Sequence, residues 1–477
     1  MCGDADQRSV ELWVDHVAFR HTEVRKGSLF VAARGAHVDG HTLTDEAVAR
    51  GAAGILAEHE VANVRVPILV RPDAREAGAR VAMATVQDLV DRMDVVGVTG
   101  TDGKTTTCWI LRDLLRSRGP VALCGTIEID DGLTRQQSEL TTPGTSMLVD
   151  LIVRAAANGC RSLVVELSSH ALHQGRAAGL PLSAAVVTNL RRDHLDYHGG
   201  LTEYAAAKAK IAGLLRSGRP LLIGGDTEGH RLLSEHVPRN SRCITVGFGE
   251  VCEVRGRRAN GLLHVDGRPE WGGIPFPLPG RHNAENLLIA MTAAAAVGAD
   301  PWRFAEAAIG PVPGRMERVG NGEGPDVRVD YAHTPAAIAA AVACGRELLA
   351  DRSGGAGRLV AVCGAGGDRD RGKRPLMGRQ LGCCDRVVLT TDNARGESAA
   401  EIAAEIRGGG GDRAEWDVVL DRAEAIAAAV WCADRDDVVL ILGKGHERTQ
   451  TIGDAVRPFE DRAVAAQALT TWRQDAR

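Results

Sequence analysis

Aromatic residues are scarce in this sequence, at 3% of 477 residues, whereas hydrophobic residues of all kinds make up 44%. The core must therefore be built mainly from Ala, Val, Leu and Ile, and this aliphatic content excludes general disorder. No apolar run approaches the roughly 20 residues that span a bilayer, and the first residues lack the basic and apolar regions of a signal peptide. At about 100–200 residues per domain, we expect a cytoplasmic globular protein of two to four domains.

An excess of positive charge is also absent, because the net charge is −5 and the pI is about 6.3. This balance argues against a nucleic-acid partner or an anionic membrane partner. The 11 cysteines are scattered without a C-x-x-C pair, which favours reduced thiols over a disulfide framework or a zinc site. Small molecules are the expected partners, and we expect a monomer.

Lysine is rare, because only six of the 57 basic residues are lysine. The remaining lysines mark candidate positions where an ammonium or a free amine is required, since Lys and Arg differ in geometry and reactivity. For Lys26 and Lys210 the simpler interpretation is that a lysine stands there by chance. For Lys104, Lys208, Lys373 and Lys444 the surrounding residues decide.

Short aliphatic strands recur along the chain, each followed by a glycine-rich turn and an alanine-rich helical stretch. This alternation predicts an α/β architecture with parallel sheets. The predicted strands include Val95–Val98, Leu163–Val165, Ala185–Thr188, Leu221–Ile223, Leu359–Val362, Val387–Thr390 and Val438–Leu442.

Three domains are predicted from composition, with boundaries near residue 90 and within the glycine- and proline-rich stretch Gly310–Gly324. They cover 1–89, 90–313 and 314–477. The first should hold a strand at Gly27–Ala33 and a helix at Thr44–Gly51. The tetraglycine Gly408–Gly411 is expected to form a surface loop.

A nucleotide-binding pattern follows the predicted strand Val95–Val98. Gly100-Thr-Asp-Gly-Lys-Thr is a shortened phosphate-binding loop, whose backbone N–H groups would cradle phosphates at a helix N-terminus. Lys104 would reach the β- and γ-phosphates and the Thr105 hydroxyl would bind Mg²⁺. A glycine turn arising by chance is the alternative, and the scarcity of lysine argues against it.

Polar residues follow the next predicted strands. Glu166 ends one strand and His194 follows another, at the sheet edge where α/β proteins bind ligands. A carboxylate there suits Mg²⁺, although an ion-paired Glu and a structural His are the alternatives. Asn283 and Asn286, one helical turn apart, suit an adenine edge or simply begin a helix.

Four polar clusters lie near strand ends in the last third of the chain, and we expect them on one sheet edge. Converging Arg, Asn and Glu side chains suit a zwitterionic amino acid, with Arg for a carboxylate and Glu for an ammonium group. The clusters are Val329–Thr334, Gly364–Pro375, Thr391–Arg395 and Gly443–Glu447.

Together these blocks resemble the Mur ligase family. The pieces that carry the resemblance are Gly100-Thr-Asp-Gly-Lys-Thr-Thr, Leu140-Thr-Thr-Pro, Glu166-Leu-Ser-Ser-His, Asn189-Leu-Arg-Arg-Asp-His-Leu-Asp-Tyr-His-Gly, Gly314-Arg-Met-Glu-Arg-Val, Asp330-Tyr-Ala-His-Thr-Pro, Gly366-Gly-Asp-Arg-Asp-Arg-Gly-Lys-Arg-Pro-Leu-Met-Gly and Gly443-Lys-Gly-His-Glu. They stand in the family's order, so chance agreement of the whole set is negligible.

The resemblance implies an α/β fold of three domains: a small N-terminal UDP-substrate-binding domain, a central parallel-sheet ATPase domain of the P-loop type and a C-terminal Rossmann-like ligase domain. It implies a cytoplasmic ligase of cell-wall biogenesis, which uses ATP and Mg²⁺ to add an amino acid to UDP-MurNAc-L-Ala-D-Glu through an acyl phosphate. The expected amino acid is meso-diaminopimelate.

The resemblance also assigns the site residues. Catalytic residues would be Lys104, Lys208 and His194. The ATP site would comprise Gly100, Thr101, Gly103, Lys104, Thr105, Thr106, Asn283, Asn286, Arg315 and Asp330. The metal would bind Thr105, Glu166, His194 and Lys208, the last as a carbamate that Arg could not supply. Thr141, Thr142, Ser168 and Arg176 would bind the acceptor, and Arg369, Asp392, Asn393, Arg395, Gly443 and Glu447 the amino acid.

Two departures from the family pattern bear on substrates. Ala394 replaces the proline of the Asp-Asn-Pro-Arg loop of diaminopimelate-adding members, and Arg20, His21 and Thr22 stand where Asp-Ser-Arg is expected. One alternative is therefore a specialised Mur-type ligase of secondary metabolism that acts on another carboxylate. A nucleotide-dependent binding or switch module without catalysis is the other alternative, and the retained Lys104, Glu166, His194 and Lys208 argue against it.

Overall fold

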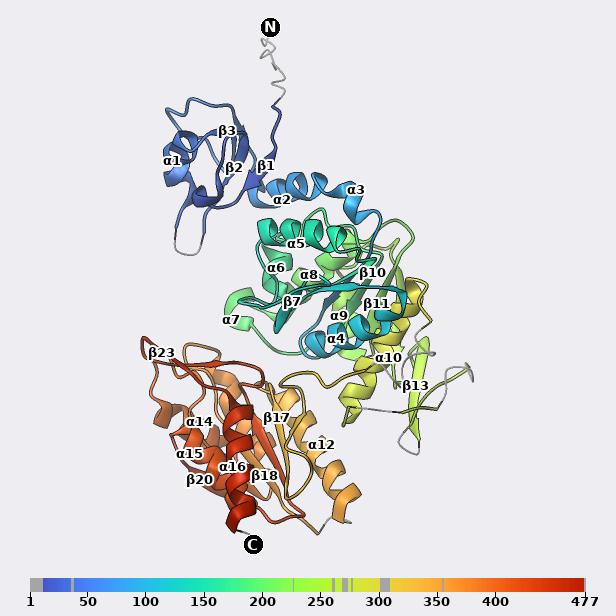
Figure 1. Cartoon of the computed structure of the whole chain (residues 1–477), viewed down its shortest axis with the longest axis vertical. Helices are drawn as coiled ribbons and strands as arrows, with labels where there is room; N and C mark the ends of the chain where they lie inside the picture. The colour runs from blue at the N-terminus through green and yellow to red at the C-terminus, as the bar shows by residue number, and fades with distance from the viewer. Residues whose placement is uncertain are drawn as a thin grey trace.

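The computed structural model describes residues 12–35, 38–225, 227–259, 262–267, 273–275, 278–300, 309–353 and 356–475. Three sheets follow one another along the long axis of the molecule, from the N-terminal unit in blue to the C-terminal unit in orange and red (Figure 1). Among the helices in these ranges, none is both long enough and apolar enough to cross a membrane.

The N-terminal unit is a four-stranded parallel sheet in the order β1-β2-β3-β4. The strand expected at Gly27–Ala33 is β2, and the helix expected at Thr44–Gly51 is α1. The boundary predicted between residues 89 and 90 falls at the end of α3, and the first strand of the central sheet begins at Asp94. The elements are β1 (His16–Ala18), η1 (His21–Glu23), β2 (Ser28–Ala32), η2 (Gly40–Leu43), α1 (Thr44–Ala49), β3 (Ala52–Ala57), β4 (Ile68–Val70), α2 (Ala74–Ala84) and α3 (Gln87–Val90).

The central sheet has the order β15-β14-β13-β12-β11-β10-β5-β9-β6-β7-β8. Its strands are β5 (Asp94–Thr99), β6 (Val121–Cys124), β7 (Glu128–Asp130), β8 (Arg135–Gln137), β9 (Ser162–Glu166), β10 (Ala184–Val187), β11 (Pro220–Gly224), β12 (Arg242–Gly247), β13 (Val254–Ala259), β14 (Leu262–Val265) and β15 (Ile274–Pro275). β5 pairs in parallel with β9 on one side and β10 on the other. The chain thus reverses direction across the sheet beside β5, which places a ligand crevice at the carboxyl end of that strand.

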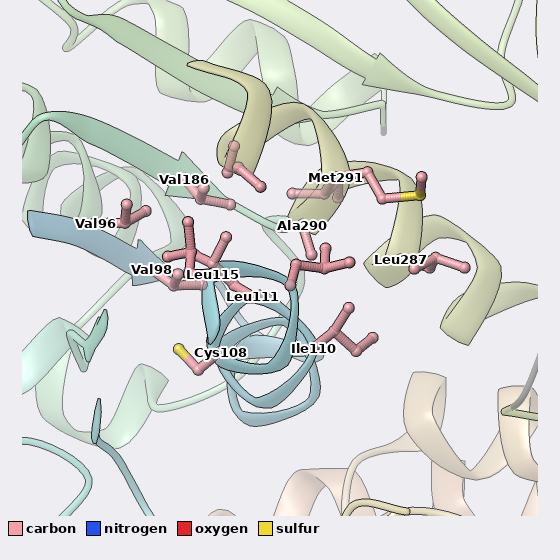
Figure 2. Close-up of a cluster of buried hydrophobic side chains, with 14 of the residues drawn as sticks. Val96, Val98, Cys108, Ile110, Leu111, Leu115, Val186, Leu287, Ala290 and Met291 are labelled. Atoms are coloured by element: carbon pink, nitrogen blue, oxygen red, sulfur yellow. The ribbon is translucent and has the colours of Figure 1, made fainter. Parts of the chain in front are cut away.

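Helices cover both faces of the central sheet: α4 (Lys104–Leu115), η3 (Arg116–Arg118), α5 (Thr145–Ala157), α6 (Ser169–His173), α7 (Leu195–His198), α8 (Leu201–Ala209), η4 (Lys210–Leu214), α9 (Thr227–Ser234) and α10 (Arg281–Ala296). The side chains of α4 and α10 meet those of β5 and β10 in one buried aliphatic core (Figure 2). Leu111, Leu115 and Met291 are fully buried there, and each such side chain contributes about 1.5–3 kcal/mol. This packing holds the start of α4 at the end of β5.

The C-terminal sheet has the order β16-β17-β21-β18-β19-β20, and all of its strands except β16 run parallel. The four predicted polar clusters follow the carboxyl ends of four adjacent strands, which confirms their placement on one sheet edge. The elements are β16 (Glu317–Val319), β17 (Asp326–Asp330), α12 (Pro335–Ser353), β18 (Leu359–Cys363), η6 (Arg371–Lys373), α13 (Arg374–Leu381), β19 (Arg386–Leu389), α14 (Ala399–Gly409), β20 (Glu415–Val418), α15 (Arg422–Trp431), β21 (Val438–Leu442), β22 (Thr449–Ile452), β23 (Ala455–Pro458) and α16 (Asp461–Asp475).

The expectation that Gly408–Gly411 forms a surface loop is wrong for its first half. Helix α14 continues through Gly409. A Cβ at Gly409 would overlap the backbone of Pro375 in α13, and one at Gly410 would overlap the Trp416 ring. These glycines allow two helices and an aromatic ring to approach closely.

A fully buried ion pair joins α15 to α16. Arg422 donates from Nε and Nη2 to the two carboxylate oxygens of Asp461, both at 2.7 Å, and both side chains are 0% exposed. We expect Asp461→Asn to lower the free energy of unfolding by about 3–5 kcal/mol, because it leaves the Arg422 charge buried without a counter-ion. Denaturant unfolding followed by circular dichroism measures this loss.

The matched control is Asp417→Asn, which breaks the pair of Arg386 and Asp417. Asp417 is 44% exposed, so we expect a loss below about 1 kcal/mol. Equal losses in the two variants would contradict the argument from burial.

Candidate active site

The loop between β5 and α4 has the shape expected of a phosphate cradle. Gly100 and Gly103 adopt φ values of 145° and 81°, and a Cβ at either position would overlap the side chain of Thr188 or Asn286. Lys104 folds back across the loop, and its Nζ donates to the carbonyls of Gly100 and Thr101 at 3.1 and 2.8 Å. The backbone N–H groups at the start of α4 are thereby left facing the crevice, where they suit an anion.

Glu166 lies beside this loop at the end of β9 and is 1% exposed. Its carboxylate accepts hydrogen bonds from the hydroxyl of Thr105 at 3.0 Å and from Thr126, through both N–H and hydroxyl, at 2.9 Å. A threonine hydroxyl next to a carboxylate is a donor set of oxygen atoms that suits Mg²⁺. The predicted pairing of Thr105 with Glu166 is therefore present.

His194 follows β10 and faces the same crevice from the other side of β5. Its backbone is left-handed, with φ of 53°, and its N–H donates to Asp193 Oδ1 at 2.9 Å. Burial lowers the pKa of His194 to about 4, so the imidazole is neutral near pH 7. A neutral imidazole is the form that ligates a metal.

Lys208 is buried beneath the phosphate loop instead of on a solvated helix face. Its Nζ donates to the Gly100 carbonyl at 2.6 Å and lies 4.4 Å from the centre of the Tyr204 ring. Burial, and the nearby charge of Lys104, lower the pKa of Lys208 well below its ordinary value. A lowered pKa favours the neutral amine, which is the form that reacts as a nucleophile.

Asn283 and Asn286 occupy the first two turns of α10, as predicted. Asn283 donates to the Pro279 carbonyl at 2.7 Å, and Asn286 accepts from the Thr107 hydroxyl at 3.4 Å. Asn286 thus links α10 to the phosphate-loop helix, whereas Asn283 bonds to the segment just before its own helix.

The C-terminal unit reaches this crevice through Arg315. Its Nη2 donates to the Thr105 hydroxyl at 3.2 Å and its guanidinium lies 4.5 Å from the centre of the Tyr331 ring. Asp330 accepts from the N–H groups of Met316 and Ala332 at 2.7 and 2.8 Å, and burial raises the pKa of its carboxyl. Asp330 therefore braces the segment that carries Arg315.

These groups line a cavity of about 260 Å³. Of the predicted ATP residues, it brings together Thr101, Gly103, Lys104, Thr105, Thr106, Asn283, Asn286, Arg315 and Asp330, and it includes Glu166 and His194. Gly100 and Lys208 do not line it. These two residues lie beneath the residues that line the cavity.

A second cavity, of about 1290 Å³, adjoins the first. Thr126, Thr141, His194 and Tyr331 line both cavities. The predicted acceptor residues Thr141, Thr142, Ser168 and Arg176 all line the large cavity, as do Arg369, Asn393 and Glu447 from the C-terminal loops. The two cavities thus meet next to Glu166 and Thr105.

Three predicted amino-acid residues lie outside the lining of that cavity. Asp392 is 7% exposed and accepts from the Asn393 N–H at 2.6 Å, and a Cβ at Gly443 would come close to its carboxylate. Arg395, with φ of 50°, donates from Nη1 to the Gly367 carbonyl at 2.7 Å. Asp392 and Gly443 support the wall that bears Asn393 and Glu447, whereas Arg395 is half-buried next to that wall.

Several residues at the site were not assigned from the sequence. Thr126 had no local pattern, because its contact with Glu166 arises only when distant segments meet. His446 lies in the predicted cluster Gly443–Glu447 but was given no role of its own, and it lines the large cavity. Tyr204, by contrast, lies one helical turn before Lys208, a spacing that could have indicated a ring against the lysine.

Three models of one protein family match this chain in order. Residues 16–97 match the model "Mur ligase family, catalytic domain", residues 98–294 match "Mur ligase middle domain" and residues 314–445 match "Mur ligase, glutamate ligase domain". The UDP-N-acetylmuramoyl-L-alanyl-D-glutamate–2,6-diaminopimelate ligase of Alkalilimnicola ehrlichii is 39% identical, over 98% of this chain and 96% of its own. The enzyme of the same name from Geobacillus thermodenitrificans is 38% identical, over 94% of each chain.

Solved structures agree in fold. A UDP-N-acetylmuramoyl-L-alanyl-D-glutamate–2,6-diaminopimelate ligase superposes with a TM-score of 0.65 at 29% identity, covering 96% of this chain and 95% of that one. The MurF ligase from Thermotoga maritima, in complex with ADP, superposes with a TM-score of 0.59 at 20% identity, covering 98% and 99% of the two chains. With three matched domains in order and relatives aligned end to end, this chain belongs to the Mur ligase family.

Proposed function

We propose that this chain is an ATP-dependent amide ligase that adds meso-diaminopimelate to UDP-MurNAc-L-Ala-D-Glu in peptidoglycan precursor synthesis. The observation that carries the proposal is the meeting of the cavity beside the phosphate loop with the large cavity at Thr126, Thr141, His194 and Tyr331. A γ-phosphate in the first cavity would face a carboxylate in the second there. The names of the close relatives supply the identity of the substrates.

In this reaction the terminal carboxylate of the acceptor attacks the γ-phosphorus of ATP, and ADP leaves. The amine of the amino acid then attacks the acyl phosphate, and phosphate leaves through a tetrahedral intermediate. The protein neutralises charge and aligns the reactants. Lys104 at the start of α4 and Arg315 beside Thr105 provide positive charge on two sides of the transferring group.

The donor set at the end of β9 and β10 fits Mg²⁺. Thr105 and Glu166 would hold the ion through oxygen, and the neutral His194 through nitrogen. When bound, the ion neutralises charge on the transferring phosphoryl group. We propose that Lys208 reacts with CO₂ to form a carbamate, releasing one proton, so that a buried amine becomes an anion beneath the phosphate loop.

The acceptor peptide would lie along the wall made by Thr141, Thr142, Ser168 and Arg176. Thr142 donates to the Glu166 carbonyl at 2.7 Å and accepts from the Ser168 N–H at 2.9 Å. Arg176 donates from Nη1 to the Thr142 carbonyl at 3.1 Å. This wall is therefore tied directly to the strand that carries Glu166, which fixes the distance between acceptor and metal.

ATP-dependent phosphate release tests the proposal. The purified chain is supplied with UDP-MurNAc-L-Ala-D-Glu and meso-diaminopimelate, and release should need both. The acceptor is then replaced by a panel of other carboxylates, and the amino acid by L-lysine, glycine and D-alanine. Turnover with another carboxylate alone would favour the specialised ligase, and nucleotide binding without turnover on any pair would favour a switch module.

The N-terminal unit gives a separate prediction about UDP. Arg20 is largely exposed and His21 Nε2 lies 3.6 Å from Glu46 Oε1, so neither side chain is held in a nucleotide pocket. We expect UDP to bind more weakly than in family members with Asp-Ser-Arg, by about 1–3 kcal/mol for a lost polar anchor. Titration calorimetry with UDP and with the full UDP-muramoyl dipeptide measures this difference.

The matched variant restores the family triplet as Arg20→Asp, His21→Ser and Thr22→Arg. It should tighten UDP binding about tenfold, which corresponds to roughly 1.4 kcal/mol. The prediction is contradicted if the natural chain binds UDP as tightly as family members with Asp-Ser-Arg do, and if the triple variant binds UDP no more tightly than the natural chain.

A further inference from the structure

Lys444 is a fully buried lysine in the loop after β21, and its side chain is 0% exposed. Its Nζ donates to three oxygen atoms: Glu447 Oε2 at 2.8 Å, Asn393 Oδ1 at 3.2 Å and the Thr449 carbonyl at 2.7 Å. An ammonium group has three donors, so every donor has a partner. Burying such a charge is costly unless it is paired in this way.

Two of the three partners face the large cavity. Asn393 and Glu447 both line it, and they also contact each other, because Asn393 Nδ2 donates to Glu447 Oε2 at 2.8 Å. Oε2 therefore accepts from both Lys444 and Asn393. Among the residues that the structure describes, none donates to the other oxygen of Glu447, Oε1.

The same contacts hold the loop that carries Asn393 and Arg395. The Thr451 N–H donates to Asn393 Oδ1 at 2.9 Å. The Arg395 N–H donates to the Thr451 carbonyl at 3.2 Å, and the Gly453 N–H to the Arg395 carbonyl at 2.8 Å. Lys444, through the Thr449 carbonyl, is bound to the start of the same β22–β23 hairpin. These hydrogen bonds hold the loop of Asn393 and Arg395 against the hairpin, in a chain that has Ala at position 394.

We propose that Lys444 is a positioning residue for the incoming amino acid. It fixes Glu447 Oε2 and Asn393 Oδ1, and this leaves Glu447 Oε1 directed to accept from an ammonium group of the substrate, while the hairpin keeps Arg395 in its left-handed conformation. The inference rests on the proposed function, because it assumes that an amino acid binds at Asn393 and Glu447.

The geometry also explains why lysine occupies this position in a chain that otherwise uses arginine. Three acceptors surround one nitrogen at 2.7–3.2 Å. A planar guanidinium is larger and spreads its donors over three nitrogens, so it cannot meet the same acceptors without displacing them from a closely packed site.

Steady-state kinetics of Lys444→Met in the full-length enzyme tests the proposal. Truncating one partner of a buried, hydrogen-bonded charge pair should raise KM for meso-diaminopimelate about 30-fold or more. KM for ATP and KM for UDP-MurNAc-L-Ala-D-Glu should change less than about threefold, because the phosphate loop and the acceptor wall make no contact with Lys444. A merely structural defect would instead lower the fraction of active enzyme. The KM values for all three substrates would then stay the same as in the unaltered enzyme. Lys26→Met, the same change at an exposed lysine, is the control.

A double-mutant cycle with Glu447→Gln shows whether Lys444 acts through Glu447. The two single changes should be strongly non-additive in kcat/KM for the amino acid, and additive effects would overturn the proposal. If Lys444→Met does not fold, Lys444→Gln, which keeps an N–H donor but no charge, decides by the same KM comparison. An unchanged KM for the amino acid in a folded variant overturns the inference alone. Failure of the unaltered enzyme to use meso-diaminopimelate overturns the proposed function and the inference together.

Discussion

Lys208→Ala should abolish turnover, with a loss of at least about 10²–10³-fold in kcat, because the change would remove the anion that we propose beneath the phosphate loop. Lys208 lies under the phosphate loop, where its Nζ donates to the Gly100 carbonyl, and burial lowers its pKa, which favours the neutral amine that reacts with CO₂. If the carbamate is the active form, excess bicarbonate or a short carboxylate such as acetate should restore part of the activity of the alanine variant. Phosphate release in the full assay measures both effects.

Two controls separate the carbamate from a simple packing role. Lys208→Arg keeps a positive charge but cannot form a carbamate, so it should be as inactive as Lys208→Ala and should not respond to bicarbonate. Enzyme held in ¹³C-bicarbonate should show a carbamate carbon signal by NMR that is absent from both variants. Full activity of Lys208→Ala would show that the carbamate is not needed.

The central site could be predicted largely from sequence because its residues sit next to strands with clear aliphatic patterns. Val95–Val98 ends at the phosphate loop, and Glu166 ends the neighbouring strand. Parallel strands bring their carboxyl ends to one edge, so placing each strand was enough to bring Thr105 and Glu166 together. The same reasoning placed the four C-terminal clusters on one sheet edge, while the adjacency of their strands is known only from the structure.

The remaining features depend on contacts between distant segments. Lys208 follows three alanines, a pattern typical of a solvated helix face, and its burial arises only when α8 packs against the phosphate loop and Tyr204. Thr126 contacts Glu166 across 40 residues of sequence. The tetraglycine shows the same limit, since only the packing of α14 on α13 explains why Gly409 is helical.

The unaltered enzyme should prefer meso-diaminopimelate over L-lysine by up to about 10⁴-fold in kcat/KM, because a site built to pair a polar group rejects an analogue that lacks it. Arg395 is the group that would pair with the distal carboxylate. Among the described residues, only the Gly367 carbonyl accepts from its guanidinium, which leaves Nε and Nη2 for a bidentate contact. Lysine would leave these donors unpaired. Parallel assays of phosphate release with each amino acid measure the ratio.

Arg395→Ala tests whether this one side chain carries the discrimination. The kcat/KM of the variant should fall about 10²-fold or more with meso-diaminopimelate and little with lysine. The preference for meso-diaminopimelate should therefore be lost, because only its distal carboxylate loses a partner. Arg379→Ala, at an exposed position on α13, should leave both values unchanged. Comparable kcat/KM for the two amino acids in the unaltered enzyme would show that the distal carboxylate is not recognised. A preference that survives in Arg395→Ala would place the recognition on a cation that lines the large cavity, such as Arg369.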